Sequence, residues 1–409
     1  NRKNKTMKNN LSIKKLKGIK PKGVKIKPGS GLEIMFNMYN YVMSNYDLNP
    51  EYHTGHWNNL YKTIQNIIEP GLIKSNLKIN DLCSFIDALE HEEPPENLKL
   101  RGLYTGCILD ILTKKYREKN EPCRVYINGL NKTGEKKFFP YLFYQAINVD
   151  ELIVENINGD CICSHIGAHS GNAKLVIARN IKGTSTLSYA GAEKGKAGIV
   201  FGQNLSGTAL LIGCGSKNGE VDALIGSEHS SFGSFEAVGM MGGHVKLVVA
   251  NNVFDLNAFS SFLMLNGVAD HVFIKDCLSE KINDLIDEYG GGIGFSCIDN
   301  EEGKRYVFEL DRKQEVFVPK KKEVVICRKK VFQKDKTADE LGRIDGYDTK
   351  QEQQYKNITT LLKFYETINL VEQTKNKSYE EVISILYKIR DLNTEVHNNL
   401  GEMVKEQEE

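Results

Sequence analysis

The feature that most constrains this chain is a 24-residue repeat that begins at residue 149. Five blocks follow one another without an insertion, and a sixth begins with ADHVFIKDC at 269. Gly171, Gly195, Gly219, Gly243 and Gly267 fall in one column of the alignment. Asn156, Asn180, Asn204, Glu228, Asn252 and Asp276 fall in a second, and Leu152, Val176, Val200, Leu224, Val248 and Val272 in a third. Columns of this kind indicate a solenoid in which each repeat stacks on the last.

The composition of the blocks favours a parallel β-solenoid over a helical one. Each block opens with aliphatic and β-branched runs such as LIV, LVI and IVF, which suit strands. Gly, Asn and Ser then recur too often for a helix to form, and the framework of a leucine-rich repeat is absent. Coils stacked about 4.8 Å apart place like residues over like.

Each column then has an expected place. The Leu152 column and the column Cys163, Leu187, Leu211, Phe235 and Phe259 should face the interior. We expect the small column Val149, Ala173, Ala197, Val221, Val245 and Ala269 where a turn narrows. Stacked Asn side chains should hydrogen-bond along the axis, and the Gly column should mark a turn that needs positive φ or has no room for a Cβ.

Helical patterns flank the repeat. Apolar residues recur at helical spacing within 31–120, broken at Pro70 and at Pro94–Pro95. The cluster Lys114, Lys115, Arg117 and Lys119 near the end of a helix over 97–119 suits the negative end of its dipole. After the repeat we expect a short helix over 280–290, one further distorted coil, and short strands at Tyr306–Leu310, Val316–Val318 and Val324–Cys327.

A capping box, Ser378-Tyr-Glu-Glu381, opens the last helix, whose apolar positions step by three or four from Val382 to Met403. Either a hairpin folded back on this chain or a coiled-coil seam to another chain accounts for that pattern.

The fold class predicted is therefore α+β: a parallel β-helix of about six 24-residue coils flanked by N-terminal and C-terminal helical regions. The expected units are a basic disordered arm (1–30), a helical cap (31–121), the solenoid (122–300), a short-strand cap (301–335) and a C-terminal helical hairpin (336–409). Within the solenoid, Arg124–Asn128 should form a strand, and the aromatic segment 138–146 an irregular first coil that closes the end against the helices.

Charge and cysteine content bear on compartment and partners. Residues 1–28 hold eleven basic residues and no acid, which leaves a net charge of −10 on the rest of a chain whose total is +1. Such an arm is either a solvated tail or a contact for a polyanion such as RNA.

Nine cysteines without framework spacing indicate reduced thiols, and no apolar run reaches membrane-spanning length, so we expect a cytoplasmic protein with no membrane contact. The chain starts at Asn1, so Met7 as the true start and a missing upstream segment both stay open.

The sharpest candidate for chemistry is the run Cys161-Ile-Cys163-Ser-His165 followed by His169. Four residues of metal-binding type lie within nine positions, and strand alternation would aim three of them to one side. The C-x-C spacing differs from that of most zinc sites, and the column of Cys163 is otherwise apolar. Cys163 is therefore expected in the core. A metal site formed by Cys161, Cys163, His165 and His169 is the alternative.

The outward column reads Asp150, Lys174, Gly198, Asp222, Lys246 and Asp270, which predicts ladders of exposed ion pairs. Glu220, Asp222 and Glu228, with His229 and His244 nearby, would gather as acids and bases if the solenoid were an enzyme acting on a glycan. Carboxylates in such enzymes stand about 5–9 Å apart, which a sequence does not reveal.

The Gly-punctuated blocks GDCICSHIGAHSGNAKLVI and GTALLIGCGSKNGEVDALI resemble right-handed β-helix domains, and are similar to the glycine-patterned β-helix of glutamate synthase and of a formylmethanofuran dehydrogenase subunit. The likeness spans about 130 residues, differs in repeat length, and implies only the handedness.

The function expected is a non-catalytic scaffold or a binding and assembly protein, with a protein partner or self-association and no cofactor. The alternatives are an enzyme acting on a glycan or polyanion along the solenoid face, and a nucleic-acid or ribosome-associated protein that uses the basic arm. A solenoid is shared by unrelated activities, so the fold does not choose between them.

Overall fold

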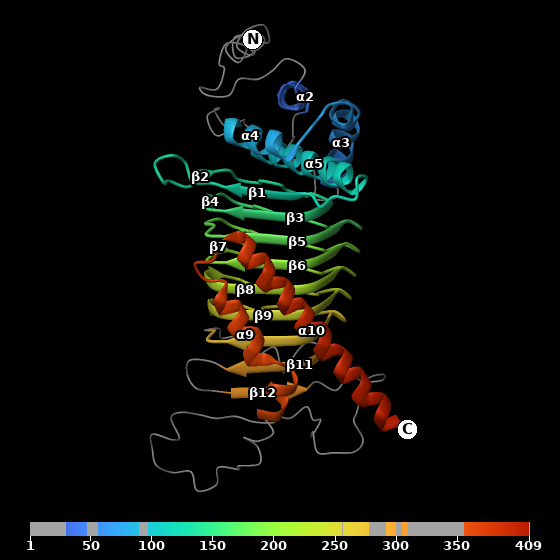
Figure 1. Ribbon diagram of the computed structural model, residues 1–409, viewed down its shortest axis with the longest axis vertical. Helices are drawn as coiled ribbons and strands as arrows, with labels where there is room; N and C mark the ends of the chain where they lie inside the picture. Colours follow the sequence, from blue (N-terminus) through green and yellow to red (C-terminus); the bar gives the residue numbers. More distant parts are fainter. Residues whose placement is uncertain are drawn as a thin grey trace.

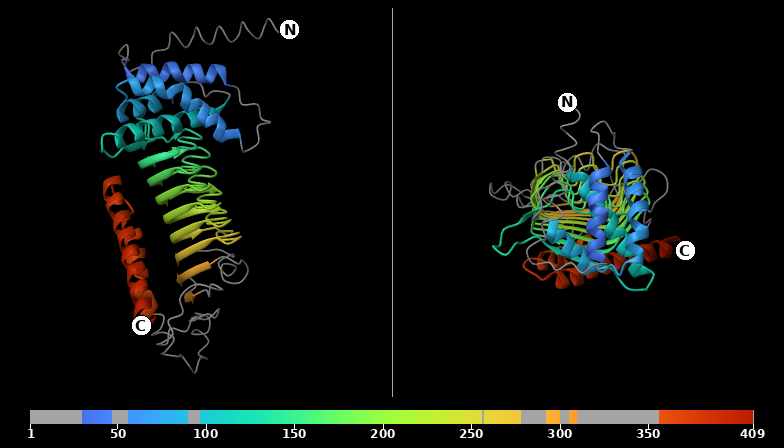
Figure 2. Two further views of the ribbon diagram at one scale, coloured as in Figure 1. Left: turned by 90° about the vertical axis from the view of Figure 1, so that its right-hand side faces the viewer. Right: turned by 90° about the horizontal axis from the view of Figure 1, so that it is seen from above.

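The computed structural model describes residues 30–46, 56–89, 97–255, 257–277, 292–299, 305–309 and 356–408. A stack of strands runs the length of the molecule, with helices across one end and a helical hairpin along one side (Figures 1 and 2). The parallel β-solenoid predicted from the repeat and the flanking helices predicted from apolar spacing are confirmed.

The N-terminal helices are α2 (Gly31–Asn45), α3 (His56–Lys74), α4 (Ile79–Leu89) and α5 (Leu98–Arg117). Ser30 caps α2 by accepting a hydrogen bond from the Glu33 amide, and Asn97 caps α5 in the same way from Leu100. The expected break at Pro70 is wrong, because α3 continues through it to Lys74. Ile68 and Leu72 on either side of Pro70 are fully buried, and that packing outweighs the lost backbone hydrogen bond.

The strands are β1 (Arg124–Asn128), β2 (Lys137–Phe138), β3 (Asn148–Glu155), β4 (Ile157–Asn158), β5 (Asn172–Arg179), β6 (Lys196–Gln203), β7 (Ser206–Thr208), β8 (Glu220–Phe232), β9 (His244–Phe254), β10 (Val268–Lys275), β11 (Gly292–Asp299) and β12 (Arg305–Glu309). The main sheet runs in the order β1-β3-β5-β6-β8-β9-β10-β11-β12. Neighbours from β3 to β11 pair in parallel at an offset of 24 residues, as Val149 with Ala173 and Val268 with Gly292. The further coil expected after β10 is thus present in β11, and β12 closes the end as an antiparallel partner.

The asparagine ladder forms as expected. Asn204 donates to Asn180, Asn180 to Asn156, and Asn156 to Asn128, over distances of 2.8, 3.1 and 3.0 Å. Residues of this column from Asn156 to Asp276 have φ between 50° and 59°, a left-handed conformation that Asn adopts at low cost. The ladder therefore links the turns of the coils from Asn128 to Asn204.

The glycine column follows the second of the two expectations. None of its five members lies in the left-handed region, and a Cβ at Gly219 would overlap the carbonyl oxygen of Gly191 on the coil before. Close backbone approach, not positive φ, therefore requires glycine here.

The first coil closes the solenoid against the helices. Gly102 and Gly106 on α5 lie so close to the backbone of Tyr141 and Tyr144 that a Cβ on either would overlap a carbonyl oxygen. The helix therefore packs directly on segment 138–146, in agreement with the sequence analysis. The basic cluster at its end does more than cap a dipole: Lys115 donates to the carbonyls of Ser75 and Leu77, and Arg117 pairs with Asp150.

The C-terminal segment is a hairpin folded back on this chain. It consists of α9 (Phe364–Gln373) and α10 (Tyr379–Glu408), and the capping box between Ser378 and Glu381 is formed. Its apolar side chains pack on the outer face of the sheet, where Leu386 and Ile389 join Leu175, Ile199 and Leu247 in one buried cluster. Of the two alternatives, the hairpin within one chain is present (Figure 2).

The strands are therefore buried on both faces. Val176 and Val200 face the solenoid interior, while Ile177 and Phe201 face the hairpin. Near-continuous apolar runs are typical of parallel strands covered on both sides.

Several predictions lie outside the described residues. These are the arm at 1–28, the break at Pro94–Pro95, the helix over 280–290 and the strands at 316–318 and 324–327.

Candidate functional site

The charged outward column from Asp150 to Asp270 lies at a kink that recurs at the same position of each coil. Ala173 faces the interior and Leu175 the outer face, so side-chain alternation slips by one residue at Lys174. The same slip separates Val221 from Ala223 and Val245 from Leu247. We call Asp150, Lys174, Gly198, Asp222, Lys246 and Asp270 the kink column.

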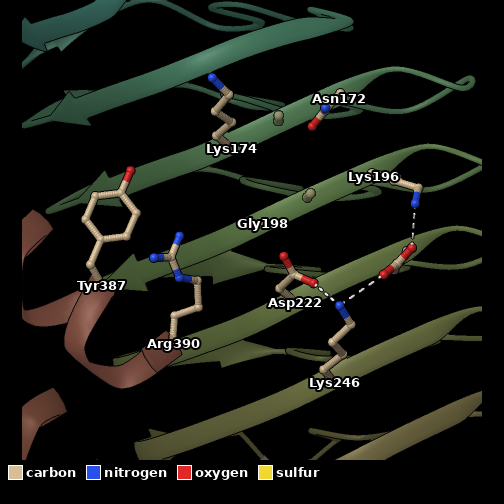
Figure 3. Close-up of a pocket in the computed structure, with 11 residues that line it drawn as sticks. Asn172, Lys174, Lys196, Gly198, Asp222, Lys246, Tyr387 and Arg390 are labelled. Atoms are coloured by element: carbon tan, nitrogen blue, oxygen red, sulfur yellow. Dashed lines mark hydrogen bonds and ion pairs between the residues drawn. The ribbon is translucent and has the colours of Figure 1, made fainter. Parts of the chain in front are cut away.

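A cleft of about 310 Å³ lies between the kink column and α10. Tyr387 and Arg390 extend into it from the helix, and the sheet supplies the other wall (Figure 3). Its lining is Asn172, Ala173, Lys174, Lys196, Ala197, Gly198, Glu220, Asp222, Lys246, Tyr387 and Arg390. The volume is at the small end of the range for ligand sites, roughly 300–1,000 Å³.

One end of the cleft holds a closed network of ion pairs. Lys246 Nζ lies 2.6 Å from Asp222 Oδ1 and 3.2 Å from Glu220 Oε1, and Lys196 Nζ lies 3.0 Å from Glu220 Oε2 (Figure 3). Two lysines thus neutralise two carboxylates. Hydrogen bonding to Lys196 and then to Lys246 lowers the pKa of Glu220, and hydrogen bonding to Asp222 raises the pKa of Lys246.

At the other end of the cleft, positive and negative side chains are not matched one to one. Lys174 Nζ lies 2.9 Å from Asp150 Oδ1, which also accepts a hydrogen bond of 2.9 Å from Arg117 Nε. Asp150 is 1% exposed, so the prediction of an exposed ladder is wrong at this position. Burial alone would raise the pKa of Asp150, but hydrogen bonds from Lys174, the Cys123 amide and Arg117 lower it. One buried carboxylate therefore serves two cations.

Gly198 forms the floor between these two ends. It is the only kink-column member without a side chain, so the wall is open between Lys174 and Asp222 (Figure 3). A Cβ there would overlap the carbonyl oxygen of Lys174, so glycine is also required by the backbone.

The helical wall is held in place by Tyr387 and its neighbours. The phenol donates a 3.0 Å hydrogen bond to Glu151 Oε1, and the Arg390 guanidinium lies 4.7 Å from the phenol ring centroid. Burial first, and then the Glu151 carboxylate, raises the pKa of Tyr387 to about 12. Arg390 pairs with Asp391, the next residue, whose side chain is 68% exposed.

Of the four residues of the candidate metal site, the structure brings two together: the rings of His165 and His169 stack with centroids 6.4 Å apart. Cys163 is fully buried in the interior, whereas Cys161, His165 and His169 are only partly buried. His165 stacks on Tyr189 with centroids 4.8 Å apart, and His169 Nδ1 lies 2.6 Å from Glu193. The reason is conformational: positions 161, 163, 165 and 169 all have φ between 51° and 59°, so strand alternation does not apply. Within the described ranges, no three His, Cys, Asp or Glu side chains are placed to hold a metal ion.

The candidate acids do not form one group either. Glu220 and Asp222 share Lys246, but Glu228 stands six residues further along β8, about 20 Å away at strand rise. There Glu228 pairs with Lys375 at 3.1 Å. His229 is buried with its Nε2 3.1 Å from the Gly202 carbonyl, and His244 pairs with Asp270.

The cleft itself was not predicted, because it needs Tyr387 and Arg390 of α10 beside strands that are far from them in the sequence. The one available signal was the glycine at 198 in an otherwise charged column.

Comparisons with protein-family models, with characterised proteins and with solved structures give no match. No helix in the described part of the chain has the length and apolarity to cross a bilayer.

Proposed function

We propose that this chain is a non-catalytic binding protein, in which a capped solenoid holds a ligand in the cleft between the kink column and α10. The observation that carries the proposal is the fixed charge of the cleft. Where pKa values shift, they move away from neutrality: Glu220 and Asp150 downward, Lys246 and Tyr387 upward. General acid–base catalysis needs a pKa near the working pH, whereas binding is served by charges that persist.

The test is a binding survey with the full chain by calorimetry, using small probes of each charge class. A ligand of any class that binds wild type but not a variant with a filled or altered cleft supports the proposal. Binding that no cleft substitution weakens contradicts it.

Assembly with a second copy of the chain is the second candidate. It is favoured by Phe232 and Phe254, whose side chains are 58% and 48% exposed on neighbouring strands. Register pairs Ser230 with Phe254, so the two rings belong to adjacent coils at one edge of the solenoid. Light scattering of the Phe232→Ser, Phe254→Ser double variant tests this: a wild-type dimer that becomes monomeric supports assembly, and an unchanged mass argues against it.

A reducing, cytoplasmic setting accompanies both proposals, since all eight described cysteines are free thiols. Polyanion contact through residues 1–28 stays a prediction, with retention on heparin before and after deletion of the arm as its measurement.

A further inference from the structure

We infer that the cleft binds a small ligand through one phosphate or carboxylate group, which lies over Gly198 between Lys174 of β5 and Arg390 of α10. The inference rests on the binding role proposed above and names the ligand class for that site. It follows from how charge is divided between the two ends of the cleft.

The lining carries four cationic side chains and two anionic ones. Both anionic side chains, Glu220 and Asp222, are engaged by Lys246, and Glu220 also by Lys196. Lys174 and Arg390 are the two cations whose acidic partners lie outside the lining. The positive charge that remains within the cleft is therefore at its Lys174 and Arg390 end.

The outside partners compensate that charge only in part. Asp150 already accepts a hydrogen bond from Arg117, so a single carboxylate balances Arg117 and Lys174 together. Asp391 is highly exposed, and an ion pair between solvated neighbours contributes little, about 0–1 kcal/mol. An incoming oxyanion thus meets one surplus positive charge.

Geometry favours an oxyanion over other ligands. Arg390 brings a planar fork of donors that matches carboxylate and phosphate oxygens, and Lys174 brings a point charge from the opposite wall. Gly198 leaves the space between them free of a side chain (Figure 3). A cationic ligand would have to displace Lys246 from Asp222 and Glu220.

The experiment measures binding of four probes to the full chain at low ionic strength by titration calorimetry: inorganic phosphate, succinate, glucose and methylammonium. Phosphate or succinate should bind, and Arg390→Gln and Lys174→Gln should each weaken that binding about tenfold, the loss expected for one charge-assisted contact. The ratio of phosphate to succinate affinity distinguishes the two sources of the anionic group. Added salt should weaken binding further, because exposed charges are screened.

Lys388→Gln is the matched control, since Lys388 is an exposed lysine on the same helix and does not line the cleft. It should leave binding unchanged. Circular dichroism of each variant verifies that the fold is kept.

Three outcomes overturn the inference. If phosphate and succinate bind the two cleft variants as tightly as wild type, the anion lies elsewhere. If glucose or methylammonium binds in their place and is lost on cleft substitution, the ligand class is wrong while the binding role stands. If none of the four probes binds, the inference and the proposed binding role both fail.

Discussion

Left-handed residues other than glycine occur in the turns of each 24-residue block from residue 149 to residue 268. Cys163, Leu187, Leu211, Phe235 and Phe259 have φ between 55° and 69°. Each such residue costs about 1–2 kcal/mol relative to a right-handed conformation. Their side chains are almost fully buried, and their amides donate to the preceding coil, as Leu187 does to Ile162 at 3.0 Å. Burial of a large apolar side chain yields about 1.5–3 kcal/mol and so offsets that cost.

Two buried histidines, His229 and His271, and the partly buried His165 should make the molecule sensitive to acid. Burial lowers the pKa of His229 to about 4, and it also lowers the pKa values of His165 and His271. Unfolded His229 would take up a proton below about pH 6.5, whereas the folded side chain stays neutral well below that. Its contribution to stability is therefore complete above pH 6.5 and is lost as the pH falls.

We expect His229→Gln to reduce the loss of unfolding free energy between pH 7 and pH 5 by about 2 kcal/mol. Glutamine keeps a donor for the Gly202 carbonyl but does not titrate. Urea denaturation at both pH values measures the difference. His397→Gln, on the exposed side of α10, is the control, and an equal slope in both variants would refute the prediction.

At the scale of elements, the C-terminal hairpin covers the outer face of the sheet. Ile177 and Phe201 would face solvent without it. Polar groups fix its turn as well: Arg179 donates to the Lys377 carbonyl, and Gln203 to Thr374 Oγ1. The hairpin is thus part of the hydrophobic core and not an appendage.

Leu386→Ala should lower the free energy of unfolding by about 2–5 kcal/mol, since Leu386 is fully buried between α10 and the sheet. Lys388→Ala, two residues away on the exposed side, should change it by less than about 0.5 kcal/mol. Guanidinium denaturation compares the two. Similar midpoints would mean that the helix contributes little to the core.

The repeat was predictable because equivalent positions of successive coils share one environment, so the same residue types recur every 24 residues. The Asn and Gly columns, the 24-residue register and the capping box all follow from local patterns. The charged column was found in the sequence, but its kink was not predictable, because Asp, Lys and Gly at one position carry no signature of a slip in alternation. The cleft depends on packing between distant segments, and Leu175 beside Val176 signals burial on two faces without saying what covers the second.

At the scale of the whole molecule, α10 crosses the stack. Tyr379 stacks on Tyr126 of β1 with centroids 4.2 Å apart, and His271 of β10 donates to Asn393 Oδ1 at 2.8 Å. Between these points the helix contacts Glu151 and lines the cleft. One helix thereby contacts both β1, which precedes the 24-residue repeat, and β10, the strand of its sixth block.

That crossing changes how the protein should melt. Repeat proteins whose units contact only their neighbours lose terminal units one at a time. Here α10 contacts β1 near one end of the sheet and β10 near the other, so loosening either end breaks contacts with a helix that is still held at the other. We expect a single calorimetric transition for wild type, with equal van't Hoff and measured enthalpies, and a van't Hoff enthalpy below the measured one once Tyr379→Ala and Asn393→Ala remove the two end contacts of α10. Two transitions in the wild-type chain would contradict the prediction and show that the coils unfold in separate steps.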